Sequence, residues 1–352
     1  MPGDPWNEAV KMLICFLMVA AVASPIGGVA RRIARRKGEA LLPRPRGWRV
    51  PWGGFEVFVA FMVLSLVVPT LVAPALDQSG IFRKLYGEDF PRIGSVAQAD
   101  DEAVQQRLQE AATMRALWTG LVSLPLQIGL LIAFRSALYP QWTQSARRSG
   151  IGGSVALAVI AWAVIALVVL VIHFGVMLFF KQLNWVVDDH PLARITAARP
   201  LLDRILFALQ ACIAAPMLEE ALFRGVLVPW LLGQKYRTWP VLVCGIALAA
   251  TSTWSLETGP SRGPTVFAAG LLVGWVLLNA VIGKKRRTVG AIYTSAALFA
   301  AVHSNVWPSP IPLFVLGLGL GWLAVRTRGV LVPIIVHGLF NAVSVLFVLR
   351  GG

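Results

Sequence analysis

Residues 216–225 read Pro-Met-Leu-Glu-Glu-Ala-Leu-Phe-Arg-Gly and lie in the middle of an apolar segment, residues 204–233. Ionisable side chains are rare in such a segment, because each costs roughly 2.5–3.5 kcal/mol inside a membrane span on insertion scales. Residues four apart share one face of a helix, so we expect Glu220 and Arg224 to form an ion pair. Glu219 points about 100° away around the helix and has no such partner. The stretch therefore predicts a buried ion pair beside an unpaired carboxylate, which could serve as a general base.

The composition of the whole chain indicates what surrounds these charges. Of its 352 residues, 57% are hydrophobic and 14% are charged, whereas a soluble globular chain has about 25% charged residues. So few charges cannot cover the surface of a soluble protein, and we predict an all-α, polytopic transmembrane helix bundle. A bilayer core needs about 20 apolar residues per helix. About ten spans are expected, at residues 9–29, 54–76, 116–137, 154–180, 204–233, 239–253, 264–282, 289–304, 311–325 and 330–349.

The net charge of +15 indicates how the chain is oriented in the membrane, and it does not indicate a nucleic-acid partner. Such basicity would suggest nucleic acid on a soluble protein, but here the basic residues lie between apolar segments, as the positive-inside rule requires. The basic cluster at residues 31–37 follows the first span. This order favours an uncleaved anchor, although Ala21-Val22-Ala23 resembles a signal-peptide cleavage site. We expect a multi-pass protein of the plasma (cytoplasmic) membrane, with both ends outside and with the bilayer as its surroundings.

Two regions are expected along the chain. Residues 1–203 form an N-terminal transmembrane region of about four spans, with an external polar loop at residues 77–115. A surface helix is predicted at residues 101–115 of this loop. Residues 204–349 form a compact membrane domain. The segment 204–233 is too long for one plain span, and we expect it to bend or break near its charges.

Two further spans place polar side chains at the same four-residue spacing. Phe299 precedes His303 by one helical turn, and His337 precedes Asn341 in the same way. With Glu219, they offer a carboxylate, two imidazoles and an amide. This set suits hydrolysis, since a carboxylate and an imidazole can deprotonate a water while an imidazole and an amide donate to an oxyanion.

A metal site is an open alternative for the same residues. Glu219, His303 and His337 also resemble the two-His-one-Glu ligand set of zinc hydrolases, although the chain has no HExxH helix. No cofactor is certain from the sequence, and a divalent metal such as zinc stays open.

Each motif has a structural alternative when taken alone. A Glu–Arg pair can hold helices together, a single histidine can be packed, and a His–Asn pair can form hydrogen bonds between helices. The three motifs coincide in a chain that has few other polar residues at such depths, and this favours one shared site. His173 stands alone in its span and is expected to be a packed histidine, whereas His190 is expected in a loop.

The patterns EExxxR, FxxxH and HxxxN, in this order on separate spans, resemble those of the CAAX-protease and bacteriocin-processing (CPBP) family. These intramembrane endopeptidases include the type II CAAX prenyl endopeptidases and the bacterial Abi proteins. The resemblance covers about residues 204–349, including the glycine-rich run 317–329. It implies that Glu219 is the water-activating base, assisted by His303. It further implies that His337 and Asn341 form the oxyanion hole. Glu220, Arg224 and Phe299 would then support the site.

We therefore predict an intramembrane endopeptidase that hydrolyses a peptide bond of a membrane-associated protein or peptide, with CAAX-type processing as one form of this activity. The first alternative is a non-catalytic membrane adaptor or a bacteriocin-immunity-type protein of the same fold. The second is a transporter with a proton relay, which would carry inverted repeats that the sequence does not show. By the predicted span limits, His303 lies near the external end and His337 near the cytoplasmic end. They can meet Glu219 only if the span 289–304 is displaced or tilted, or if the segment from Asn305 to Pro312 dips into the membrane.

Overall fold

The computed structural model describes residues 5–38, 50–91, 102–138, 150–183, 200–233, 238–251, 254–255, 259–260, 262–282, 286–304 and 307–350. Its N-terminal part contains α1 (Pro5–Arg36), α2 (Gly54–Met62), the π-helical segment η1 (Val63–Val67), α3 (Val68–Gln78), α4 (Ile81–Tyr86), α5 (Glu102–Leu138) and α7 (Ile151–Gln182). One helical run follows, made of α8 (Leu201–Leu209), η4 (Gln210–Ala214), α9 (Ala215–Leu222), η5 (Phe223–Leu227) and α10 (Val228–Gly233). The C-terminal part contains α11 (Thr238–Thr251), α12 (Arg262–Ile282), α13 (Arg286–Ala301), α14 (Pro310–Thr327) and α15 (Leu331–Leu349).

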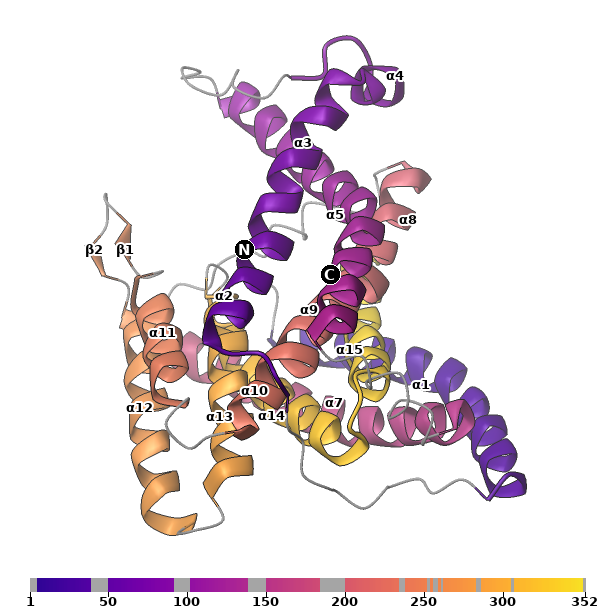
Figure 1. Ribbon diagram of the computed structural model, residues 1–352. Helices are drawn as coiled ribbons and strands as arrows, with labels where there is room; N and C mark the ends of the chain where they lie inside the picture. Colours follow the sequence, from indigo (N-terminus) through magenta and orange to yellow (C-terminus); the bar gives the residue numbers. More distant parts are fainter. Residues whose placement is uncertain are drawn as a thin grey trace.

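The predicted all-α class is confirmed. In the described ranges, the only β-structure is one antiparallel pair of two-residue strands, β1 (Trp254–Ser255) and β2 (Gly259–Pro260), between α11 and α12 (Figure 1). Every predicted span overlaps a helical run. Seven of these runs in the described part of the chain are long and apolar enough to cross a membrane. The runs of α11, α12 and α13 are not among the seven, so the number of ten spans stays a prediction.

The expectation of a separate surface helix was wrong, and of the bend or break expected in residues 204–233 the break is not observed. The predicted surface helix at 101–115 is not separate, because α5 continues through it for 37 residues. Leu108 and Ala111 are buried in this part of α5, so the helix packs on its neighbours instead of lying at the membrane surface. The segment 204–233 does not break near its charges either. It stays helical from Leu201 to Gly233 and absorbs the irregularity in two π-helical segments.

A proline shortly after each π-helical segment explains why these segments form. Each is followed at its second position by a proline: Pro69 after η1, Pro216 after η4 and Pro229 after η5. In a π-helical turn a carbonyl bonds the N–H five residues later, and proline has no N–H to give. The regular pattern therefore leaves one carbonyl without a partner in each helix, at Leu64, Ala211 and Arg224.

Side-chain amides from other helices bond two of these carbonyl groups. Gln127 of α5 donates to the Leu64 carbonyl with an Nε2···O distance of 2.7 Å. Asn341 of α15 donates to the Ala211 carbonyl with an Nδ2···O distance of 2.7 Å. A buried backbone carbonyl needs such a partner because no water reaches it in the membrane. Pro69 and Pro216 thus each create an acceptor that ties its helix to another.

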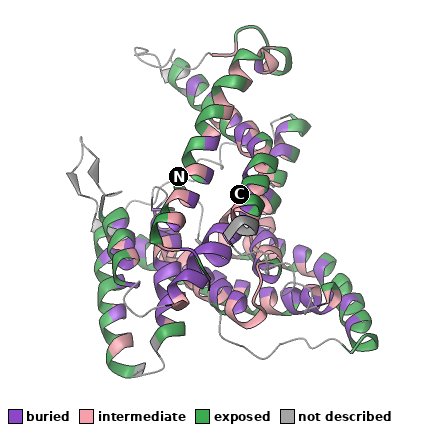
Figure 2. Ribbon diagram, viewed as in Figure 1, coloured by how far each residue is buried: buried purple, intermediate pink, exposed green. Residues whose placement is uncertain are grey.

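The buried residues form two main clusters. One joins α1, α7, α14 and α15 and contains Trp162 and Leu320. The other joins α2, η1, α5, α9, α10 and α13 and contains Leu64, Leu222 and Phe299. Figure 2 shows the buried residues gathered where the helices meet and exposed residues along the outer faces of α1 and α12. Helices of residues 1–203 thus share both clusters with the C-terminal region, whose separation into domains stays a prediction.

The outer surface of the helices is strongly apolar. Val22, Leu71 and Val281 are 67%, 68% and 82% exposed, respectively. A contiguous surface of this kind is unfavourable in water but matches the hydrocarbon of a bilayer. Together with the seven apolar helices of the described residues, this identifies a multi-pass integral membrane protein.

We expect Gln127→Leu to lower the stability of the protein by about 1–2 kcal/mol, the range of interhelical hydrogen bonds in membranes. The substitution keeps the apolar bulk but leaves the Leu64 carbonyl without its donor. Thermal unfolding in detergent measures the effect. Gln182→Leu, at the exposed end of α7, is the matched control and should unfold like the wild type. Equal melting temperatures for all three proteins would contradict the prediction.

Candidate active site

The ion pair predicted from the spacing is present and fully buried. Arg224 Nη1 lies 3.0 Å from Glu220 Oε1, and both side chains are 0% exposed. Arg224 Nη2 also donates to the Gly317 carbonyl of α14 at 3.3 Å. The guanidinium lies over the ring of Phe299, with its Cζ 4.6 Å from the centroid. Carboxylate, carbonyl and aromatic face together compensate for removing the cation from water.

Gly317 allows α14 to come this close. A Cβ atom at this position would lie 3.1 Å from the Cα of Ala296 and 3.4 Å from Nη2 of Arg224. Any larger side chain would therefore push α14 away from both α13 and the guanidinium. The glycine-rich run 317–329 suggested family resemblance only, and this packing role was not predicted from it.

His337 of α15 joins the pair through the same carboxylate oxygen. Its Nδ1 lies 2.9 Å from Glu220 Oε1, and the side chain is 4% exposed. An ionised carboxylate only accepts hydrogen bonds, so Nδ1 of the neutral ring must carry the proton. Its Nε2 then presents a lone pair, and this atom lies 3.9 Å from Oε2 of Glu219. The distance is too long for a direct hydrogen bond but suits a bridging water.

Glu219 stands apart from the buried pair, as the sequence predicted. Its side chain is 27% exposed, against 0% for that of Glu220. Its Oε2 is nevertheless buried and has no hydrogen-bond partner in the described part of the chain. A carboxylate that faces an opening, with one oxygen aimed at an imidazole lone pair, is arranged to hold a polar molecule between the two groups.

His303 reaches the site through Phe299. It lies in the turn after α13, and its Nδ1 is 2.8 Å from the Phe299 carbonyl, so Nδ1 donates and Nε2 is free of a proton in the neutral ring. The ring of Phe299 contacts both imidazoles, with centroid distances of 5.0 Å to His303 and 5.7 Å to His337. No hydrogen bond from His303 to Glu219 or His337 is found among the described residues.

Both histidines contact Phe299 at the end of α13. This helix runs from Arg286 to Ala301, rather than over the predicted span 289–304. Its last turn carries Phe299, which packs against His337 in the second turn of α15. The end of α13 therefore lies level with the buried pair, as the sequence required for a shared site.

Asn341 donates a hydrogen bond to the backbone of the helical run Leu201–Gly233, called the motif helix because it carries Glu219, Glu220 and Arg224. One N–H of its amide goes to the Ala211 carbonyl, and the second remains for another acceptor. Gly338, on the same face of α15, packs on the next carbonyl: a Cβ atom there would lie 2.5 Å from the Cys212 oxygen. Pro216 leaves the Ala211 carbonyl without an N–H partner, since it cannot donate to it. The proline in the sequence was the signal for this contact, which sequence reasoning missed.

The predicted metal ligands do not assemble into a metal-binding group. Among the described residues, no three or more His, Cys, Asp or Glu side chains are placed so as to hold a metal ion. His303 instead directs Nδ1 to a backbone carbonyl. This contact leaves Nε2 of His303 free, and a divalent metal at these residues stays an open prediction.

The other two histidines lie outside the site. His173 of α7 has its ring 5.4 Å from that of the neighbouring Phe174. It remains interpreted as a packed residue. His190 lies outside the described residues.

Comparison with known proteins agrees with the three motifs. Residues 201–281 and 275–343 match the model of the family described as type II CAAX prenyl endopeptidase Rce1-like. No curated protein and no solved structure matches the chain. The matched segments contain every residue of the candidate site and make up less than half of the chain. For this C-terminal part, the match supports the predicted resemblance to the CAAX-protease and bacteriocin-processing family, and it supports a protease.

We expect Arg224→Met to destabilise the protein by about 3–5 kcal/mol, because the substitution leaves the Glu220 carboxylate buried without its cation. The loss should appear as a large drop in the melting temperature of the purified protein in detergent. Lys11→Met is the matched control. It breaks the partly exposed pair with Glu8, whose N···O distance of 3.1 Å is similar, and should change stability by less than about 1 kcal/mol. Similar effects of the two substitutions would contradict the prediction.

Proposed function

We propose that this protein is an intramembrane endopeptidase in which Glu219 activates the hydrolytic water. The observation that carries the proposal is the placement of Glu219 Oε2 opposite His337 Nε2 at 3.9 Å, with the imidazole held from behind by Glu220. A water between the two atoms would face a carboxylate and an imidazole lone pair. The family match to CAAX prenyl endopeptidases supports the same chemistry.

The reaction follows from these positions. Glu219 removes a proton from the water, and the resulting hydroxide attacks the carbonyl carbon of the scissile peptide bond. The proton can pass to Nε2 of His337, because the Glu220 carboxylate on Nδ1 stabilises the imidazolium that forms. Collapse of the tetrahedral intermediate breaks the C–N bond, and the leaving amine takes the proton. Overall one water is consumed and one peptide bond becomes a carboxylic acid and an amine.

The developing oxyanion needs hydrogen-bond donors. In the proposal, the protonated Nε2 of His337 and the second N–H of Asn341 supply them, and each such donor is worth roughly 2.7–4 kcal/mol in the transition state. His303 assists Glu219 in holding the water, with Nε2 as acceptor. Phe299 sets the spacing between the two imidazoles by contacting both.

The proposed substrate is a membrane-associated protein or peptide, presented to Glu219 from the bilayer of the plasma (cytoplasmic) membrane. CAAX-type processing is the form of this activity that the family description supports. The seven apolar helices of the described residues would keep enzyme and substrate in one membrane.

We expect Glu219→Gln to lower turnover by about 10²–10⁴-fold, the contribution of a general base, while the melting temperature stays that of the wild type. The amide keeps the shape of the side chain but cannot take the proton. The measurement is cleavage of a farnesylated peptide with a CAAX terminus, and of an unlipidated peptide library, by purified protein in detergent with mass-spectrometric detection.

Glu8→Gln is the control for this substitution, because Glu8 lies in a partly exposed pair at the start of α1. It should cleave at the wild-type rate. Unchanged turnover in Glu219→Gln would disprove the role of the base. A wild-type protein that cleaves nothing, with a cellular phenotype that survives both Glu219→Gln and His303→Ala, would favour the non-catalytic adaptor.

A further inference from the structure

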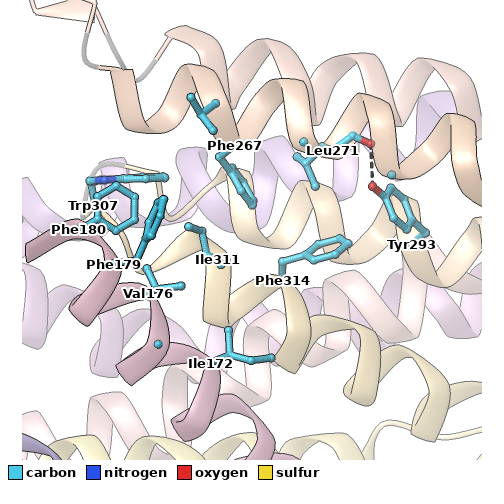
Figure 3. Close-up of a pocket in the computed structure, with 14 residues that line it drawn as sticks. Ile172, Val176, Phe179, Phe180, Phe267, Leu271, Tyr293, Trp307, Ile311 and Phe314 are labelled. Atoms are coloured by element: carbon cyan, nitrogen blue, oxygen red, sulfur yellow. Dashed lines mark hydrogen bonds between the residues drawn. The ribbon is translucent and has the colours of Figure 1, made fainter. Parts of the chain in front are cut away.

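A second feature of the structure lies away from the candidate active site. A cavity of about 780 Å³ opens between α7, α12, α13 and α14 (Figure 3). Its lining includes Val176, Phe180, Phe267, Trp307 and Phe314, and no charged side chain. Phe180 and Phe267 both contact the ring of Trp307, with centroid distances of 5.4 and 6.4 Å. The volume lies within the range of ligand sites, roughly 300–1,000 Å³.

Two glycines keep this cavity open. A Cβ atom on Gly175 of α7 or on Gly270 of α12 would meet no other heavy atom within 4 Å. Both residues line the cavity, so the missing side chains leave free space instead of a helix contact. Gly274 differs, since a Cβ there would lie 2.6 Å from Oη of Tyr293. The empty volume is thus built into the sequence at Gly175 and Gly270.

Water cannot fill a cavity of this kind. The hydroxyl of Tyr293 already donates to the Leu271 carbonyl at 2.6 Å (Figure 3), and a buried water needs two to four polar partners. Phe179 and Val266 at the rim are 56% and 58% exposed, so the cavity opens towards the bilayer. The molecule that fills it is therefore a hydrocarbon chain.

A basic residue directly after the lining residues of α7 indicates which molecule carries the chain. Lys181 follows Phe180 in the last turn of α7 and is exposed. An ammonium beside an uncharged cavity complements a phosphate that is attached to an acyl chain. We propose that this cavity binds one acyl chain of an anionic phospholipid of the bilayer, with the headgroup phosphate at Lys181. The site would not depend on peptide cleavage, and it lies against Trp307 in the segment that follows the His303 turn.

The test is retention of lipid by the purified wild-type protein and its variants. Each protein is incubated with phosphatidylglycerol or with phosphatidylcholine in detergent, and bound lipid is measured by native mass spectrometry. Gly270→Leu fills the cavity without a clash and should bind phosphatidylglycerol at least about tenfold more weakly. Lys181→Gln should lose the preference for phosphatidylglycerol over phosphatidylcholine while it still binds lipid.

Matched controls exist for both substitutions. Gly129→Leu also points into open space, but on α5, and Lys84→Gln removes an exposed lysine of α4; both should bind lipid like the wild type. Gly175→Leu fills the cavity from α7 and replaces Gly270→Leu if that variant fails to fold. Wild-type phosphatidylglycerol binding in the folded cavity-filling variant would overturn the proposal. Loss of cleavage of a lipidated peptide with unchanged phospholipid binding would also overturn it, since the cavity would then serve the substrate's own lipid.

Discussion

The site depends on one carboxylate oxygen, Oε1 of Glu220, which accepts from both Arg224 and His337. A buried ion without partners costs several kcal/mol, so this oxygen fixes the positions of its donors. Arg224 reaches from it to the carbonyl of Gly317 on α14. His337 belongs to α15, so the motif helix, α14 and α15 are bound to a single charge. This oxygen also requires that Nδ1 of His337 carries the proton. Nε2 of the neutral ring then keeps a lone pair, which faces Glu219.

The backbone of the motif helix imposes a second constraint. Pro216 follows a π-helical segment and leaves the carbonyl of Ala211 without an N–H partner, and the next carbonyl along the chain is that of Cys212. Asn341 donates to the first, and Gly338 packs closely on the second. Both lie on the face of α15 that also carries His337, so the register of α15 is set by backbone groups as well as by Glu220. π-helical segments are frequent at functional sites. Here the segment η4 explains the HGxxN spacing, because Gly338 and Asn341 both contact its carbonyls.

Local spacing allowed much of the site to be predicted from the sequence. The pairing of Glu220 with Arg224 follows from four residues on one helix, and the lengths of the apolar runs gave the helices. The continuity of α5 could not be predicted from its polar first turns, because the burial of Leu108 and Ala111 depends on other helices. The bond between Asn341 and Ala211 was missed for the same reason. It joins residues that only the packing of α15 on the motif helix brings together.

Adjacent glutamates with opposite environments show how the fold separates two roles. Glu220 is 0% exposed and Glu219 27%, because a rotation of about 100° per residue turns Glu220 towards His337 of α15 and leaves Glu219 partly exposed. The apolar side of this helix packs on Leu64 and Leu131 of the N-terminal region. Trp52 adds a hydrogen bond of 3.1 Å to the Val226 carbonyl. These three residues lie outside the family match, yet they contact this helix. The N-terminal region therefore takes part in packing the helix that carries both glutamates.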